Sequence, residues 1–208
     1  MNRKAFMSMT CVALVLTGCA FARRMPPVTL YALDLSPYAI APTQRRSPET
    51  LRLATVRVAA PFDSNTLFYR FDDVRYVSDP YHAFAAGPGE IVSNQVARWL
   101  DAAGPFRDVA RPGSLRPARY VLEISVSELY GDFRAGRPPA AVLNLGFALI
   151  DQNGSRPRTV YERSISRTID LPAASREELM RGYSQALSDA LTQLTHELEA
   201  TLPADRRE

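Results

Sequence analysis

Residues 120–169 read YVLEISVSELYGDFRAGRPPAAVLNLGFALIDQNGSRPRTVYERSISRTI, and they contain the clearest strand pattern of the chain. In its first part, Leu122, Ile124 and Val126 alternate with polar side chains, a pattern typical of a strand with one buried face. Leu143–Ile150 is almost entirely apolar on both faces, as expected of a central strand. The stretch therefore predicts strands that pair with one another in sequence order.

A third strand follows a strong turn signal. Asn153-Gly154 favours a tight turn, and Thr159–Ile169 then returns along the sheet. Arg163 and Arg167 share the side of its apolar residues. Because long arginine side chains reach water most easily at a margin, we expect this strand to lie near an edge.

The residues after this meander predict a long helix. Ser175 and Glu178 fit a capping box, in which each side chain bonds the other residue's free backbone N–H. An apolar stripe at helical spacing follows over about five turns: Tyr183, Leu187, Leu191, Leu194, Leu198 and Leu202. We expect the stripe to pack on the sheet, with binding of a partner helix as the alternative.

Working toward the N-terminus, a second helix is expected from about Pro88 to Ala103. Its apolar stripe includes Trp99, and Gly104-Pro105 ends it. Core packing is the main interpretation of Trp99, and a platform for a ligand is the alternative.

Shorter strands are expected before this helix. They cover Thr29–Leu35, Leu51–Ala60 and two short strands within Phe68–Val77, which turn at Asp72-Asp73. Strands and helices thus alternate loosely around three consecutive strands. The predicted fold class is α+β, a two-layer sandwich in which a mixed β-sheet carries two main helices on one face.

The first nineteen residues predict export. Arg3 and Lys4 precede an apolar run that ends in Leu16-Thr17-Gly18-Cys19, and this run is far shorter than the roughly 20 residues that cross a bilayer. A signal peptide fits better than a membrane helix. The motif resembles the lipobox of bacterial lipoproteins, which implies cleavage between Gly18 and Cys19 and lipidation of Cys19.

Four segments are therefore expected. They are a signal peptide (1–18), a lipidated tether (19–28), one folded domain (29–202) and a frayed tail (203–208). The tether from Ala20 to Val28 reaches roughly 30 Å when fully extended, so the domain must lie close to its membrane.

Composition excludes several kinds of function. Removal of Arg3 and Lys4 with the signal lowers the formal charge from +3 to +1, which argues against a nucleic-acid footprint. Lys4 is the only lysine, so the mature chain has no phosphate-loop or Schiff-base lysine. The two cysteines, Cys11 and Cys19, leave no disulfide for the folded domain.

No catalytic set of residues is recognisable. The two histidines, His82 in an expected loop and His196 on the last helix, have no neighbouring cysteine or histidine. Asp72-Asp73 could hold a cation, although aspartate in a hairpin turn is favoured for its backbone hydrogen bonds. We therefore expect no enzyme activity, no metal site and no cofactor.

An aromatic segment is the main candidate for binding. Phenylalanines and tyrosines between Phe62 and Phe84 are interrupted by aspartates, and such aromatic side chains are enriched at interfaces. The alternative is that about half of them complete the core. The candidate partner interface comprises Tyr69, Arg70, Phe71, Arg75, Tyr76 and Tyr81.

Several short motifs together resemble the ABC-type transport auxiliary lipoproteins, the PqiC-like family. They are the lipobox, Tyr31-Ala32-Leu33, Val56-Arg57-Val58 before Pro61, the run from Tyr69-Arg70 to Asp79-Pro80-Tyr81, a helix ending in Trp99-Leu100, and Leu129-Tyr130-Gly131-Asp132-Phe133. The likeness covers about residues 29–200.

The resemblance implies a non-enzymatic, periplasm-facing lipoprotein. It would work beside an MCE-domain substrate-binding protein, an ABC ATPase and a permease that move lipids or other hydrophobic molecules between the inner and outer membranes. Some family members form rings, which makes a homo-oligomer an expectation. Ala20 after Cys19 resembles the outer-membrane sorting default. The alternatives are a structural or assembly lipoprotein of the envelope and, less favoured, a periplasmic hydrolase.

Overall fold

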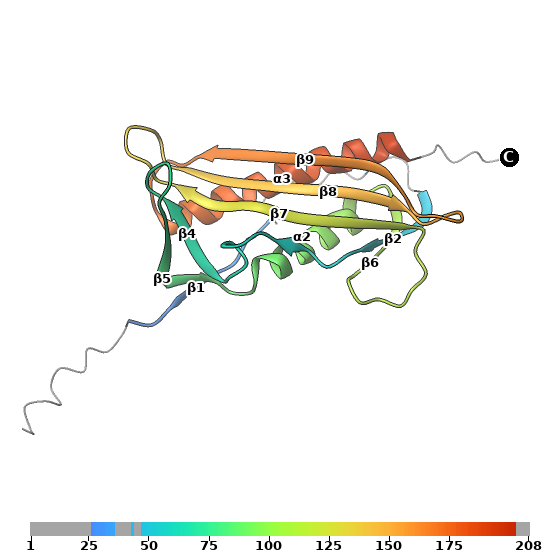
Figure 1. Ribbon diagram of the computed structural model, residues 1–208, viewed down its shortest axis with the longest axis horizontal. Coiled ribbons are helices and arrows are strands. Elements are labelled where there is room, and N and C mark those ends of the chain that lie inside the picture. Colours follow the sequence, from blue (N-terminus) through green and yellow to red (C-terminus); the bar gives the residue numbers. More distant parts are fainter. Residues whose placement is uncertain (1–25, 36–42, 44–46, 203–208) are drawn as a thin grey trace, which may run out of the picture.

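The computed structural model describes residues 26–35, 43 and 47–202 (Figure 1). Within them one sheet of nine strands carries two helices. In chain order the elements are β1 (Thr29–Tyr31), β2 (Ser47–Leu53), β3 (Arg57–Val58), β4 (Thr66–Arg70), β5 (Tyr76–Phe84), α2 (Pro88–Ala103), β6 (Phe106–Ala110), β7 (Tyr120–Asp132), β8 (Ala140–Asp151), β9 (Arg158–Asp170) and α3 (Arg176–Thr201). The expected signal peptide, Cys19 and the tail lie outside the described residues.

The predicted fold class is confirmed. The sheet is mixed, and both helices lie on the same face of it (Figure 1). Strands β7, β8 and β9 form the expected antiparallel meander, with twelve paired positions between β7 and β8. Strand β9 pairs only with β8 among the described strands, so the expectation of an edge position is confirmed.

Strand β7 holds the rest of the sheet on its second edge. Three short strands pair with it in parallel, one after another along its length: β2 at Tyr120, β3 at Ser125 and β4 at Gly131. Beyond them, β6 adds to β2, β5 adds to β4, and β1 adds to β5. Both arms of the sheet therefore depend on this one strand of 13 residues.

The core lies between the sheet and the helices. Leu122, Ile124 and Val126 of β7 are fully buried on the helix side, while the opposite face carries polar groups such as the ion pair between Arg57 and Glu123. Between Val126 and Glu128 the pairing with β8 shifts by one residue. This bulge turns Leu129 back into the core and directs Tyr130 to the outer face, away from the helices.

The two helices meet through Trp99. Its indole Nε1 donates a hydrogen bond of 3.2 Å to the Thr195 hydroxyl in α3, and the side chain is buried. Trp99 is therefore a core residue, as its main interpretation held. The α3 stripe from Tyr183 to Leu198 is buried against the sheet, which confirms that expectation also.

The capping box of α3 is only half formed. The Ser175 hydroxyl accepts a hydrogen bond from the Glu178 backbone N–H at 3.2 Å. The reciprocal bond is replaced, because the Ser175 N–H donates to the Ala173 carbonyl and the Glu178 carboxylate pairs with Arg181. A nearby arginine on the same helix face competes successfully for the glutamate.

The strands differ from expectation in three ways. Strand β1 ends at Tyr31, because residues 32–35 leave the sheet and enter the space between the helices. There Gln95 of α2 donates to the Leu33 carbonyl at 2.9 Å, and the Asp34 N–H donates to the Ser184 hydroxyl of α3 at 3.2 Å. Leu33 and Leu35 are buried in this position.

The other two differences concern interrupted or unrecognised strands. Leu51–Ala60 is not one strand. Leu53 pairs with Leu122 of β7 and Arg57 pairs with Ser125, so the segment between β2 and β3 contains one residue more than the matching segment of β7. Strand β6, with Arg107 and Asp108 in its middle, was not expected. Its charged, weakly alternating sequence is compatible with a strand only because β6 lies at an edge.

Gly182 gives a test of how closely α3 approaches the sheet. A Cβ at this position would lie 2.7 Å from the Ala141 Cβ in β8 and 2.6 Å from Leu171 Cδ2. Gly182→Ala should lower the free energy of unfolding by about 1–3 kcal/mol, although alanine normally favours a helix by about 1 kcal/mol over glycine. Urea unfolding measures the change. Adding Ala141→Gly should recover part of the loss, and a stabilised Gly182→Ala variant would contradict this packing.

Candidate interaction surface at one end of the sheet

The candidate surface is built from two neighbouring loops at one end of the sheet (Figure 1). One is the β4–β5 hairpin turn, residues 71–75, and the other is the β7–β8 loop, residues 133–139. The strands that carry them are paired at Tyr69 and Gly131, and the Phe133 N–H donates to the Arg70 carbonyl at 2.8 Å. The expected turn at Asp72-Asp73 is confirmed.

Asp72 closes the hairpin turn. One of its carboxylate oxygens accepts hydrogen bonds from the Val74 N–H at 3.0 Å and the Arg75 N–H at 2.7 Å. These two bonds lower the pKa of Asp72 below its usual value. The other oxygen pairs with the Arg75 guanidinium at 3.1 Å. The turn interpretation of Asp72 is therefore the one that the geometry supports.

Arg70 stabilises the turn by binding two of its backbone carbonyl groups. Its guanidinium donates to the carbonyl of Asp72 at 3.1 Å and to the carbonyl of Asp73 at 2.9 Å. It also lies 5.6 Å from the centre of the Tyr76 ring. With both sides of the turn hydrogen-bonded, the hairpin has a defined shape rather than that of a loose loop.

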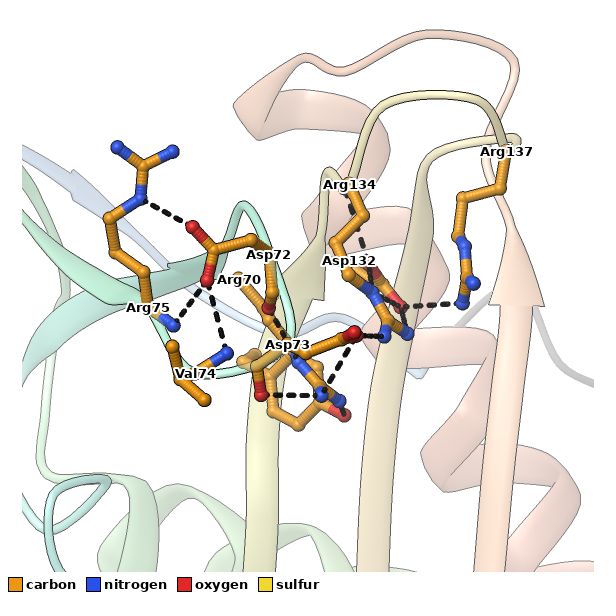
Figure 2. Close-up of polar contacts among 9 residues, drawn as sticks. Arg70, Asp72, Asp73, Val74, Arg75, Asp132, Arg134 and Arg137 are labelled. Carbon is orange, nitrogen blue, oxygen red and sulfur yellow. Dashed lines mark hydrogen bonds and ion pairs between the residues drawn. The ribbon is translucent and has the colours of Figure 1, made fainter.

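Arg134 joins the two loops, as Figure 2 shows. It forms a two-pronged pair with the Asp132 carboxylate, at 2.9 Å through Nε and 2.5 Å through a terminal nitrogen. Its other terminal nitrogen donates to the Asp73 carboxylate at 2.9 Å. The bonds from Arg134 lower the pKa of Asp132 despite its burial. Arg137 lies 3.9 Å from the same carboxylate.

Aromatic clusters lie on both faces of the sheet behind these loops. On the outer face, Tyr76 packs edge-on against Tyr130 with ring centres 5.2 Å apart, and Phe62 stacks on Tyr130 at 6.0 Å. On the helix side, Tyr69 stacks on Phe133 at 5.2 Å, and Phe71 lies 6.4 Å from Phe133. The hairpin thus presents different rings on its two sides.

A buried carboxylate organises the far part of β5. Residues 79–82 bulge opposite Leu67, because Thr66 pairs with Ala83 and Phe68 pairs with Ser78. Asp79 closes this bulge by accepting from the backbone N–H groups of Tyr81 and His82 at 2.9 and 3.1 Å. The loop expected around His82 is therefore a bulge inside a strand.

Side chains from three elements converge on the second oxygen of Asp79. The Tyr69 hydroxyl donates to it at 2.8 Å, His82 Nδ1 lies at 2.8 Å, and Arg176 of α3 approaches to 3.4 Å. Burial by itself raises the pKa of Asp79, but its hydrogen bonds outweigh burial and lower the pKa to about 2. Asp79 is therefore ionised and ties β4 and β5 to the start of α3.

The six expected interface residues are divided by the structure. Tyr69 is only 5% exposed and belongs to the core, so as a surface residue it was wrongly placed. Arg70 and Tyr76 lie on the outer face, and Phe71, Arg75 and Tyr81 lie at the hairpin and the bulge. Sequence reasoning missed Arg134, Arg137 and Val74. The one available signal for the two arginines was their position beside Gly136 and Pro138-Pro139, residues typical of a turn.

The histidines are not brought together. His196 is exposed on α3, and His82 is bonded to Asp79. Among the residues that the structure describes, no three histidine, cysteine, aspartate or glutamate side chains gather in a way that could hold a metal ion. In the same part of the chain, neither helix is long and apolar enough to cross a membrane.

Comparison with known proteins identifies the family. The sequence model of the ABC-type transport auxiliary lipoprotein component matches residues 31–198. The chain belongs to this family. The resemblance seen in the short motifs is therefore confirmed, and the family is that of an auxiliary component of ABC-type transport.

Solved structures share the fold of this auxiliary lipoprotein. Protein XCC0632 from Xanthomonas campestris, of the DUF330 family, has a TM-score of 0.72 at 20% identity, covering 83% of this chain and 96% of that one. The structure of an uncharacterized protein has a TM-score of 0.65 at 15% identity, covering 83% of this chain and 99% of that one. The hypothetical protein CT253 from Chlamydia trachomatis has a TM-score of 0.51 at 9% identity, covering 74% of this chain and 99% of that one. Comparison with curated proteins gave no match.

Two variants of the auxiliary lipoprotein test the link between its loops. Asp132→Ala should lower the free energy of unfolding by about 2–3 kcal/mol, because it removes charge-assisted hydrogen bonds from a side chain that is only 9% exposed. Asp73→Ala should cost less than about 1 kcal/mol, since Asp73 is 88% exposed and water screens its pair with Arg134. Urea unfolding compares the two, and equal losses would contradict the central role of Asp132.

A second test uses the pH dependence of stability. The pKa of Asp79 is lower in the folded lipoprotein, about 2, than in an unfolded chain, so ionised Asp79 stabilises the fold above the unfolded value. That stabilisation, about 2 kcal/mol, is lost as pH falls from about 4 through 2. Near pH 5 the wild-type protein should therefore be more stable than Asp79→Asn by a constant free energy of unfolding. This difference should become smaller as the pH falls from about 4 to about 2. A constant difference down to pH 2 would show that Asp79 is not stabilised in its charged form.

Proposed function

We propose that this protein is a membrane-anchored, periplasm-facing lipoprotein that serves an MCE-type ABC transport system for lipids or hydrophobic solutes. The match to the auxiliary component family over residues 31–198 is the observation that carries the proposal. The Leu16-Thr17-Gly18-Cys19 motif supports anchoring through Cys19 after cleavage behind Gly18. Ala20 favours the outer membrane as the site of the anchor.

The proposed work of the domain is binding. Its partners are the MCE-domain substrate-binding protein and, through it, the permease and ATPase. An auxiliary protein of this kind needs a rigid surface with a few strong anchors, for which tyrosine and arginine are the favoured residues. The outer face of the β4–β5 hairpin, with Tyr76 and Arg70 packed on each other, has this character.

The anchor is tested by substitution of each cysteine. Cys19→Ala should abolish incorporation of a labelled fatty acid and block normal processing, because the thiol that receives the lipid is gone. Cys11→Ala is the matched control and should leave labelling intact, since Cys11 lies within the expected signal peptide. Absence of label from the wild-type protein would refute lipid anchoring.

Partner binding is tested with two tyrosines of one strand. Tyr76 and Tyr81 are similarly exposed, at 39% and 41%, but only Tyr76 packs in the outer aromatic cluster. Tyr76→Ala should weaken co-purification with the MCE protein by about 1–3 kcal/mol in binding free energy. Tyr81→Ala should leave it unchanged.

Thermal unfolding by circular dichroism must accompany this comparison, because Tyr76 also contacts Tyr130 and Phe62. A folded Tyr76→Ala protein that binds normally would move the interface elsewhere. If the wild-type protein retains no MCE partner at all, a structural or assembly role in the envelope becomes the better conclusion.

A further inference from the structure

Exposed apolar side chains are concentrated at one end of the molecule. The described residues contain eight large hydrophobic side chains that are exposed. Seven of them come from the start of β1, the β4–β5 hairpin and the bulge of β5: Val28, Leu30, Phe71, Val74, Tyr76, Val77 and Tyr81. The eighth, Leu115, lies in the loop before β7. We call Phe71, Val74, Val77 and Tyr81 the end surface.

The strand order brings the start of β1 beside the bulge of β5. Strand β1 pairs in parallel with the last part of β5, with Thr29 opposite His82 and Leu30 opposite Ala83. The residues just before Thr29 therefore continue past His82 beside the bulge of β5. Figure 1 shows the described chain entering β1 at the same end of the molecule as the β4–β5 hairpin and the β7–β8 loop.

The hairpin presents its apolar tip in a fixed position. Val74 is 89% exposed, although Asp72 binds its N–H and Arg70 binds the two preceding carbonyls. Asp73, next to it, is held by Arg134. A hairpin secured at this many points cannot fold its apolar tip back onto the domain. An exposed apolar tip that is held rigidly in this way is typical of a contact site.

The length of the chain before β1 limits how far this end can lie from the membrane. Residues 20–28 span roughly 30 Å at most, and they begin at the cysteine that would carry the lipid. Arg23 and Arg24 lie within this tether and would be attracted to anionic headgroups. The end surface is therefore held within reach of the bilayer in which the acyl chains are embedded.

We infer that the end surface rests on that bilayer, with Phe71, Val74, Val77 and Tyr81 in the headgroup region. The inference rests on the lipid anchor proposed above. Tyrosine suits the boundary between headgroups and acyl chains, and arginine can contact phosphates while its stem stays in apolar surroundings. Arg75 and Arg137, both more than half exposed, border the end surface in this role.

This orientation separates the two binding functions. Phe71, Arg75 and Tyr81, which sequence reasoning assigned to a protein partner, contact lipid instead. Tyr76 and Arg70 on the outer face stay available to the transporter. The long strands of the meander then project away from the membrane, and the opposite end, with the loop between β6 and β7, points into the periplasm (Figure 1).

The test places a dye at chosen positions of the full-length, acylated protein. Once Cys11 is removed and Cys19 is lipidated, an introduced cysteine is the one free thiol of the mature chain. Val74→Cys and Val77→Cys sample the end surface. Leu115→Cys is the matched control, because Leu115 is also a hydrophobic residue and is 98% exposed. Each protein carries a polarity-sensitive dye and is reconstituted in vesicles of phosphatidylethanolamine and phosphatidylglycerol.

The inference expects a blue-shifted emission at positions 74 and 77, quenching by lipids that carry a nitroxide, and protection from iodide in the water. The dye at position 115 should show none of these. Equal iodide quenching at positions 74 and 115 would overturn the inference. Shielding of position 74 only after addition of the MCE protein would also overturn it and would make the end surface a protein interface. Mass spectrometry of the same samples detects acylation, so failure of the anchor is distinguished from failure of the orientation.

Discussion

The pairing of both edges of β7 is the constraint on which the rest of this structure depends. On one edge β8 is paired over almost the whole strand, and on the other three short parallel strands follow one another. Strands as short as β3, with two residues, have little stability of their own. They persist because β7 supplies a rigid template and because their apolar side chains reach the core under α2 and α3.

The same template creates the candidate surface. Strand β4 pairs with β7 in parallel, so the turns that follow β4 and β7 lie beside each other. Asp132 and Arg134 then join loops about sixty residues apart in the chain, and Asp73 completes the bridge. The Val126–Glu128 bulge directs Tyr130 outward, which gives Tyr76 a ring to pack against. One local irregularity in the central strand thus determines the aromatic surface of the hairpin.

The features of this end suit binding better than chemistry. Its charged groups are paired with one another: Arg134 with Asp132 and Asp73, and Arg75 with Asp72. Even the buried Asp79, whose pKa is strongly lowered, is used to hold β5 and α3 together rather than left free for a reaction. With the proposed anchor at Cys19, the rigid apolar end and the separate aromatic face would hold a transporter component at a fixed distance from the membrane. This is a physical basis for an auxiliary role in transport.

The fold class, the meander and both helices could be predicted from the sequence, because alternation with a period of two and stripes with a period of 3.6 report directly which side chains are buried. It also placed the hairpin turn at Asp72-Asp73 and an edge strand with Arg163 and Arg167. It could not place β6, the break between β2 and β3, or the departure of Leu33 from the sheet, because each depends on a partner distant in the chain. For the same reason Tyr69 was taken for a surface residue, and Arg134 was missed. Only the tertiary structure decides which face of a strand is covered, since that depends on where α3 and the neighbouring strands pack, and local sequence carries no record of their positions.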